Sequence, residues 1–214
     1  MGAERPKQFL ELAGKPLIWH TLAALLAVPR IASVHVVLAP EDEWWESFDW
    51  SELGPRLKVL RVGGATRAQS VTNALAELAL EVEEDDWMLV HDAARACLAS
   101  AQVEALIDAL EFDPVGGLLA VPVADTLKHG DRQGRVVGTV PREGLWKAQT
   151  PQMFRHGLLC RALAETQGVT DEAGAVEALG LSPRLVAADS TNFKVTYPQD
   201  VALAEIILNS RRRA

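Results

Sequence analysis

The sequence predicts an α/β fold in which a mostly parallel sheet carries helices on both faces. Short β-branched runs, such as SVHVVLA over residues 33–39, alternate with segments whose apolar residues follow helical spacing, such as residues 16–28. Strands that alternate with helices favour parallel pairing, because each helix returns the chain to the same end of the sheet. Residues 125–142 interrupt this alternation with two β-like pieces around HGDRQG, which predicts a protruding β-hairpin.

The remaining elements follow in order along the chain. Pro29 ends the first helix, Ser100 is the expected N-cap of the helix over residues 100–110, and Thr170 that of the helix near 171–179. Further helices are expected at 41–50, where the pattern is mixed, and at 66–80, 153–165 and 198–211. Further strands are expected at 58–62, 87–91, 116–124 and 183–188.

Length and charge limit the possible classes of protein. The 214 residues suit a single domain over 1–214, with residues 125–142 as an arm. A net charge of −8 argues against a broad nucleic-acid surface, and we find no signal peptide or membrane-spanning run. Cys97 and Cys160 lack metal-ligand spacing and are interpreted as buried thiols in a reducing compartment. We therefore expect a soluble cytoplasmic protein.

Ligands of such sheets bind past the carboxyl ends of the strands, and the first candidate segment there is GGATRAQS. Gly63 and Gly64 would let the backbone approach a ligand, and the following helix N-terminus offers free N–H groups to a phosphate or a nucleobase carbonyl. Arg67 and Ser70 add polar side chains. The alternative, favoured for this motif alone, is an ordinary strand–helix turn capped by Thr66.

The segment HDAAR is the stronger candidate. Asp92 falls at the carboxyl end of a strand, where a carboxylate is a good Mg²⁺ ligand in a phosphate site. Arg95 could bind a phosphate through its planar guanidinium. In the alternative interpretation Asp92 caps the next turn, Arg95 pairs with it, and His91 is an ordinary core histidine.

Other cations stand in loops. Lys7, Arg142 and Lys194 are each interpreted as solvated charges when taken singly. Together with Arg67 and Arg95 they would form a local basic pocket in an acidic protein.

Taken in order, the motifs resemble one family. They are PKQFLELAGKPLIWHTL, GGATRAQSV, VHDAAR, VPVADTLK, VPREGLWKAQTPQMF, TDEA and NFKVTYPQD. This series resembles 2-C-methyl-D-erythritol 4-phosphate cytidylyltransferases of the non-mevalonate isoprenoid pathway, from Met1 to about Glu205. The resemblance implies a Rossmann-like fold of the nucleotidyltransferase type and transfer of a cytidylyl group from CTP to a sugar-alcohol phosphate, with Mg²⁺ or another divalent cation. The sister ribitol-5-phosphate cytidylyltransferases share much of the pattern, but the spellings HDAAR and TDEA favour the first family.

The resemblance also implies roles for individual residues. Lys7 and Lys194 would stabilise the transition state at the α-phosphate. Gly64 and Ser70 would contact the cytosine, beside Gly63 in the same nucleotide loop, and Arg67 would hold that loop. The sugar phosphate would be bound by Asp92, which also lies beside the metal, and by Arg95, Thr126, Arg142 and Thr170. The arm at 125–142 would join a homodimer, so that Thr126 and Arg142 serve the neighbouring subunit.

Two positions depart from the family pattern. Ala96 stands where a proline usually follows HDAAR, which we expect to loosen the turn without affecting the chemistry. Met1-Gly2 aligns with the end of the family's glycine-rich triphosphate loop, so we expect the first strand and that loop to be encoded upstream. We expect the chain by itself to be a poor catalyst. The alternatives are a ribitol-5-phosphate enzyme and a catalytically impaired binding or scaffold protein.

Overall fold

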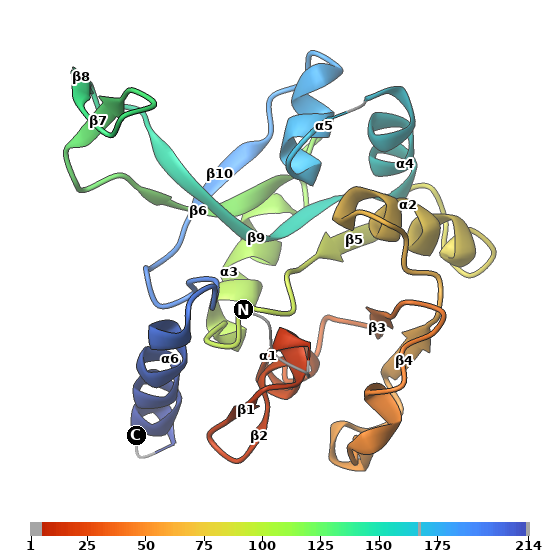
Figure 1. Cartoon of the computed structure of the whole chain (residues 1–214). Coiled ribbons are helices and arrows are strands. Elements are labelled where there is room, and N and C mark those ends of the chain that lie inside the picture. Colours follow the sequence, from red (N-terminus) through yellow and green to blue (C-terminus); the bar gives the residue numbers. More distant parts are fainter. Residues whose placement is uncertain (1–5, 167, 213–214) are drawn as a thin grey trace.

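The computed structural model describes residues 6–166 and 168–212 and confirms the α/β class. Its central sheet has the strand order β10-β6-β9-β5 (Figure 1). These strands are β5 (Trp87–Val90), β6 (Gly117–Pro122), β9 (Trp146–Arg155) and β10 (Arg184–Ala187). β6 pairs in parallel with β10, whereas β9 runs antiparallel to both β5 and β6. The sheet is therefore mixed, because β9 enters it from the arm rather than from a crossover helix.

A second, parallel strand pair lies below this sheet in Figure 1. It consists of β3 (Val34–Val37) and β4 (Leu57–Leu60). On β3, Val34 and Val36 are buried and alternate with half-buried residues, which is the period expected for a strand with one face on the core. The segment between the two strands forms short 3₁₀ turns, η2 (Trp45–Ser47) and η3 (Ser51–Leu53), instead of the expected helix at 41–50.

Helices cover both faces of the central sheet, as predicted. Neighbouring residues of a strand point to opposite faces, and Leu119 and Met153 lie in one buried cluster while Leu118 and Phe154 lie in another. The first cluster includes residues of α1 (Leu17–Leu26) and α3 (Ser100–Leu110). The second includes residues of α2 (Arg67–Leu78), α4 (His156–Glu165) and α5 (Glu172–Ala178).

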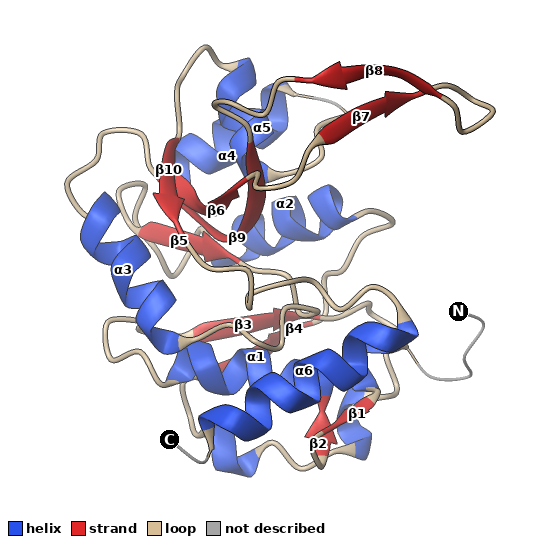
Figure 2. Cartoon of the chain, turned by 90° about the vertical axis from the view of Figure 1, so that its left-hand side faces the viewer, coloured by secondary structure: helices blue, strands red, loops and turns tan. Residues whose placement is uncertain are grey.

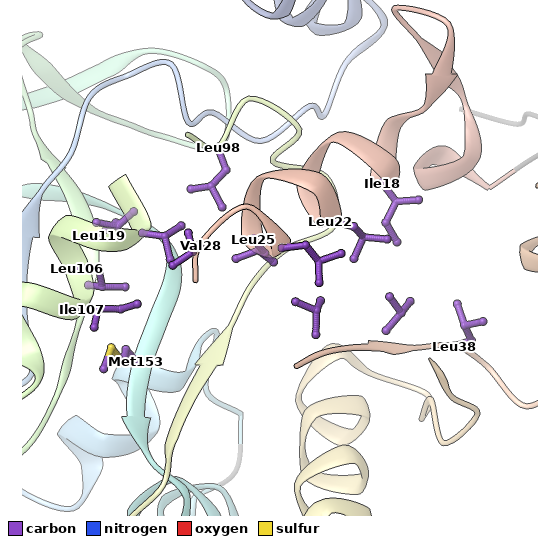
Figure 3. Packing of buried hydrophobic residues seen from close by; sticks show 14 of the residues in the cluster. Ile18, Leu22, Leu25, Val28, Leu38, Leu98, Leu106, Ile107, Leu119 and Met153 are labelled. Atoms are coloured by element: carbon purple, nitrogen blue, oxygen red, sulfur yellow. The ribbon is translucent and has the colours of Figure 1, made fainter. Parts of the chain in front are cut away.

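Figure 3 shows the first cluster from close by. Leu22 and Leu25 of α1 project towards the chain segment that ends at Leu38, and Ile107 of α3 lies beside Met153 of β9. α1 thereby joins the β3–β4 pair to the central sheet through apolar contacts. Burial of these side chains is the main driving force for that arrangement.

A third buried cluster supports the loops that follow β5. α6 (Pro198–Arg211) contributes Ala204, the loop after β5 contributes Ala94 and Ala96, and the segment before α6 contributes Val195. Figure 2 shows α6 lying near α1 and the small hairpin of β1 (Glu11–Leu12) and β2 (Lys15–Pro16). Ala96 is fully buried there, and the small side chain is accommodated in the cluster. In the described part of the chain no helix is long and apolar enough to cross a membrane.

The predicted hairpin is present and projects from the sheet (Figures 1 and 2). Its strands are β7 (Leu127–Gly130) and β8 (Val136–Val140), which pair antiparallel.

Three expectations about element ends are wrong. The helix expected from Met153 begins at His156, because Met153 and Phe154 belong to β9 and are buried on opposite faces of the sheet. The N-cap of α3 is Ala99 rather than Ser100, which already has helical geometry. The N-cap of α5 is Asp171 rather than Thr170, because the Asp171 carboxylate accepts the N–H of Gly174 at 3.0 Å.

Candidate active site

Charged side chains from distant segments converge on Asp92, directly after β5. Arg67 Nε donates to Asp92 Oδ1 at 2.8 Å, and Lys194 Nζ lies 3.0 Å from Asp92 Oδ2. Arg95 Nε lies 3.8 Å from the same Oδ2 atom. We call Asp92, Arg67, Arg95, Lys194 and Glu172 the Asp92 cluster. Its three cations and two carboxylates leave a net positive charge, as an anion site requires.

The backbone around Asp92 is fixed by hydrogen bonds to neighbouring segments. The N–H of Asp92 donates to Thr150 Oγ1 of β9 at 3.1 Å. The N–H of Val195 donates to the Ala94 carbonyl at 2.8 Å, and Arg95 donates to the Asn192 carbonyl at 2.7 Å. The HDAAR loop and the NFK segment are therefore held against each other, which brings Lys194 to Asp92.

Glu172, at the start of α5, is the buried member of the cluster. Its side chain is 1% exposed and accepts two hydrogen bonds from Arg67, at 2.6 Å from Nη1 and 3.0 Å from Nη2. A buried carboxylate needs such a partner, since an unpaired charge in the interior is strongly destabilising.

The electrostatics favour the charged forms of Asp92 and Arg67, whereas burial lowers the pKa of Arg95. Burial acts to raise the pKa of Asp92, but Arg67 and Lys194 outweigh it, so that this pKa lies below its ordinary value. Burial likewise acts to lower the pKa of Arg67, and Glu172 and Asp92 reverse this and raise it. Burial lowers the pKa of His91 to about 3, so this imidazole is neutral at physiological pH. His91 contacts Thr150 Oγ1 through Nδ1 at 2.9 Å, as expected of a core histidine.

The loop between β4 and α2 is also well ordered by its own contacts. Thr66 caps α2 by accepting the N–H of Gln69 at 3.1 Å, as the alternative interpretation expected. Gly64 donates its N–H to Ser70 Oγ at 3.0 Å. A Cβ on Gly63 would lie 2.8 Å from the Leu38 carbonyl oxygen, so glycine is required there by close approach of two backbone segments.

The other predicted site residues lie outside these contacts. Lys7, in η1 (Lys7–Phe9), forms no ion pair within the described residues; the pKa of Asp200 is lowered mainly by N–H groups of Tyr197 and Thr196 and to a smaller extent by Lys7. Thr126 is exposed at the base of the arm, where Arg142 donates to the Ala124 carbonyl. Met1-Gly2 lies outside the described residues.

Thr170 lies beside the cluster. It lines a cavity of about 260 Å³ together with Arg67 and Glu172. Thr170 is exposed, so its hydroxyl is accessible to a ligand.

Asp92 is the cluster carboxylate more accessible to a divalent cation, because its side chain is 11% exposed whereas that of Glu172 is 1% exposed. Each of its oxygens contacts one cation closely and keeps a further lone pair. Mg²⁺ commonly uses one or two carboxylates together with substrate phosphates and water, which this donor set permits. Across the described residues no group of three or more His, Cys, Asp or Glu side chains is arranged to hold a metal ion without such phosphates.

The sequence reasoning missed three buried polar residues of the site. Glu172 was interpreted only as an acid in the first turn of a helix, and its signal was that this acid follows a capping position in TDEA. Thr150 was missed because β9 was not predicted. Asn192, which is fully buried, donates to the Thr150 carbonyl at 2.9 Å and had no signal beyond its place in NFKVT.

Comparisons with known proteins agree with this geometry. Residues 1–210 match the family model described as 2-C-methyl-D-erythritol 4-phosphate cytidylyltransferase. The protein of that name from Dechloromonas aromatica is 63% identical over 211 residues, which cover 99% of this chain and 92% of the relative. Its counterpart from Chromobacterium violaceum is 59% identical over 212 residues, which cover 98% and 92%.

Solved structures are similar over nearly the whole chain. The crystal structure of a 4-diphosphocytidyl-2C-methyl-D-erythritol synthase matches with a TM-score of 0.88 and 43% identity, over 95% of each chain. The 2-C-methyl-D-erythritol 4-phosphate cytidylyltransferase from Thermus thermophilus matches with a TM-score of 0.78 and 34% identity, over 95% of this chain and 94% of the other.

Proposed function

Because this chain belongs to the 2-C-methyl-D-erythritol 4-phosphate cytidylyltransferase family, we propose that it transfers a cytidylyl group from CTP to 2-C-methyl-D-erythritol 4-phosphate. This nucleotidyltransferase reaction releases pyrophosphate and serves non-mevalonate isoprenoid biosynthesis. The observation that carries the proposal is the convergence of Arg67, Arg95 and Lys194 on Asp92 at the end of β5. A net positive cluster at a strand end suits a reaction between two phosphate groups.

The proposed step needs no general base from the protein. A phosphate monoester has a second pKa of about 6, so it is mostly a dianion at neutral pH. One of its oxygens forms a bond to the α-phosphorus of CTP, while the bond from that phosphorus to the bridging oxygen breaks and pyrophosphate leaves with the electron pair. The buried, neutral His91 is not required as a proton acceptor.

Catalysis then consists of positioning and charge stabilisation. Lys194 is suited to this role because its side chain is 46% exposed while its ammonium is held at Asp92. We propose that Lys194 and Lys7 stabilise charge at the α-phosphate. Arg95, Asp92 and Thr170 would bind the sugar phosphate.

The nucleotide is proposed to bind at the loop between β4 and α2. Gly63, Gly64, Arg67 and Ser70 would form this site, with Gly64 and Ser70 at the cytosine. The pre-formed hydrogen bond between Gly64 and Ser70 supports this role, because an ordered loop loses less entropy on binding.

We propose Asp92 as the protein ligand of Mg²⁺ or another divalent cation. Bound there with the substrate phosphates, the ion would neutralise part of their charge. Asp92 would in turn keep Arg67 and Lys194 directed at the same point.

The arm is proposed to form a homodimer, in which Thr126 and Arg142 reach the partner's active site. Exposed valines on the arm support this, since they are uncovered in the single chain. We further propose one cytidylyltransferase domain over residues 1–214 and a cytoplasmic location. The free Cys97 and Cys160 fit a reducing compartment.

A pyrophosphate-release assay tests the proposed function. The purified protein is given CTP, Mg²⁺ and either 2-C-methyl-D-erythritol 4-phosphate or ribitol 5-phosphate, and EDTA is added in a control. We expect release with the first acceptor and loss of it with EDTA. Faster release with ribitol 5-phosphate would reassign the acceptor.

The same assay addresses the expectation about the start of the chain. It is run on this chain and on the protein translated with any in-frame sequence upstream of Met1. Activity only in the extended protein would support an upstream loop, and no release from either would leave a binding or scaffold role.

A further inference from the structure

We propose that Glu172 is a positioning residue, which holds Arg67 in the one orientation that directs its Nε–H at Asp92. The inference rests on the proposed function for its kinetic consequence, whereas its structural part stands on contacts in the free protein. Each terminal nitrogen of Arg67 donates one N–H to Glu172, at 2.6 and 3.0 Å, and Nε donates to Asp92 at 2.8 Å. A planar guanidinium bound at both ends in this way cannot rotate without breaking several hydrogen bonds.

Glu172 is itself placed with little freedom. Gln152 of β9 is 1% exposed, accepts the N–H of Ala173 at 2.7 Å and donates to the Asp171 carboxylate at 2.9 Å. The residues on either side of Glu172 are therefore tied to the central sheet. The Glu172 carboxylate is presented to Arg67 from a fixed backbone.

These hydrogen bonds form a continuous network from Gln152 through α5 and Glu172 to Arg67 and Asp92. Glu172 and Arg67 are 105 positions apart in sequence, and Arg67 and Asp92 are 25 apart. The network thus joins α5, α2 and the loop after β5, which lie in different parts of the fold in Figure 1.

Net stabilisation is a weak explanation for this arrangement. A buried ion pair contributes little net stability compared with apolar residues of similar size, because both charges lose their hydration. Positioning is the better explanation, since a displacement of about 1 Å at reacting groups can lower a rate about 100-fold.

The arrangement also divides the work among the cations. Arg67 is committed to two carboxylates, whereas Arg95 Nε is buried without a hydrogen-bond partner and the Lys194 side chain is 46% exposed. Arg95 and Lys194 thus keep donors for a substrate phosphate. Glu172 engages two of the four terminal N–H groups of Arg67.

Glu172→Gln and Glu172→Asp test the proposal. The first keeps the size and removes the charge; the second keeps the charge and withdraws it by one methylene. We expect kcat to fall about 10- to 100-fold in both. KM for CTP should change less than kcat, because among the proposed nucleotide-binding residues only Arg67 contacts Glu172. Glu177→Gln, an exposed site on the same helix, is the matched control.

A second readout does not depend on turnover. The ¹⁵N–¹H signal of Arg67 Nε, assigned by its absence in Arg67→Lys, should exchange slowly with water in the wild-type protein and shift in Asp92→Asn. We expect it to broaden or exchange faster in Glu172→Gln and Glu172→Asp, and to be unchanged in Glu177→Gln.

The outcomes separate the two proposals. An active wild-type enzyme with kcat within twofold in both Glu172 variants, or an unchanged Arg67 Nε signal in both, would overturn the role of Glu172. Absence of transferase activity both from this chain and from the protein with any in-frame upstream sequence would overturn the proposed function, and the Nε signal would still decide the positioning. Should Glu172→Gln fail to fold, Glu172→Asp keeps both readouts.

Discussion

The Asp92 cluster and the β7–β8 arm are both proposed to contact the sugar phosphate, yet they are held in opposite ways. The Asp92 side chain is 11% exposed and is contacted from α2, from the NFK segment and, through its backbone, from β9. On the arm, the consecutive residues Val136 and Val137 are 66% and 64% exposed. Because consecutive strand residues point to opposite faces, neither face of the arm is covered.

This difference in burial shows which of the two regions a single copy of the protein can hold in place by its own contacts. The cluster takes its geometry from buried polar contacts within the chain. Among the described residues, the hydrogen bonds of β7 and β8 run within the arm, such as Lys128 to Thr139 at 2.7 Å, and an isolated two-stranded hairpin is marginally stable in water. A second surface is therefore expected to cover the arm.

Asp92→Asn should have the largest effect, a fall in kcat of about 100-fold or more. The substitution keeps the shape but removes the charge that gathers Arg67 and Lys194. Steady-state pyrophosphate release measures it, with the exposed Asp108→Asn as control. A fall of less than threefold would show that the cluster is structural.

The double variant Val136→Asp/Val137→Asp should lower kcat about 10- to 100-fold without unfolding the chain. Charges on both faces of the arm would oppose its burial against a partner, and the partner's active site would lose Thr126 and Arg142. Sedimentation velocity should show monomers while far-UV circular dichroism is unchanged. Persistence of a dimer with full activity would contradict the role of the arm.

His91 should make stability depend on pH, and the exposed His129 of the arm is the position for a control substitution. His91 has a folded pKa of about 3 against an ordinary 6.5, so the unfolded state binds more protons between these values and stability is lost as pH falls. From pH 7 to pH 5 the free energy of unfolding should fall by about 2 kcal/mol for this group.

Urea unfolding at both pH values measures this loss in the wild-type protein and in His91→Asn and His129→Asn. His20 and His35 also have lowered pKa values caused mainly by burial, so the difference between variants is the relevant quantity. The fall in the free energy of unfolding between pH 7 and pH 5 should be smaller in His91→Asn than in the wild-type protein. In His129→Asn it should equal the wild-type value. Equal losses in all three proteins would mean that His91 is not the buried neutral group described above.

Local patterns in the sequence predicted much of the fold and part of the site. The bounds of α6, Pro198–Arg211, match the prediction, because Pro198 marks the first helical position. The motifs HDAAR and NFK were placed together through resemblance, and the structure brings Lys194 to Asp92.

β9 could not be predicted by alternation. Six consecutive residues of it are buried, because helices cover both faces of the sheet, and Gln149 and Gln152 interrupt its apolar run. The place of Glu172 in TDEA indicated only a helix start, because its partner Arg67 is 105 positions away in the sequence.

Alanine substitutions of two glycines, one beside the site and one on the arm, are expected to have the smallest effects, and these effects are on the free energy of unfolding. Gly63→Ala should lower the free energy of unfolding by about 1 to 2 kcal/mol, because its Cβ would lie 2.8 Å from the Leu38 carbonyl oxygen and 2.9 Å from the Ala39 nitrogen. Gly138→Ala on β8 should change it by less than about 0.5 kcal/mol, since nothing lies within 4 Å of the added atom.

Denaturant unfolding of the two glycine variants, at protein concentrations above and below that of dimer dissociation, measures both effects. In the monomer only Gly63→Ala should be destabilised. Destabilisation by Gly138→Ala that is confined to the dimer would indicate that the partner packs closely on β8. The same loss in the monomer would mean instead that the arm is covered within its own chain, which would remove the contrast between the two regions.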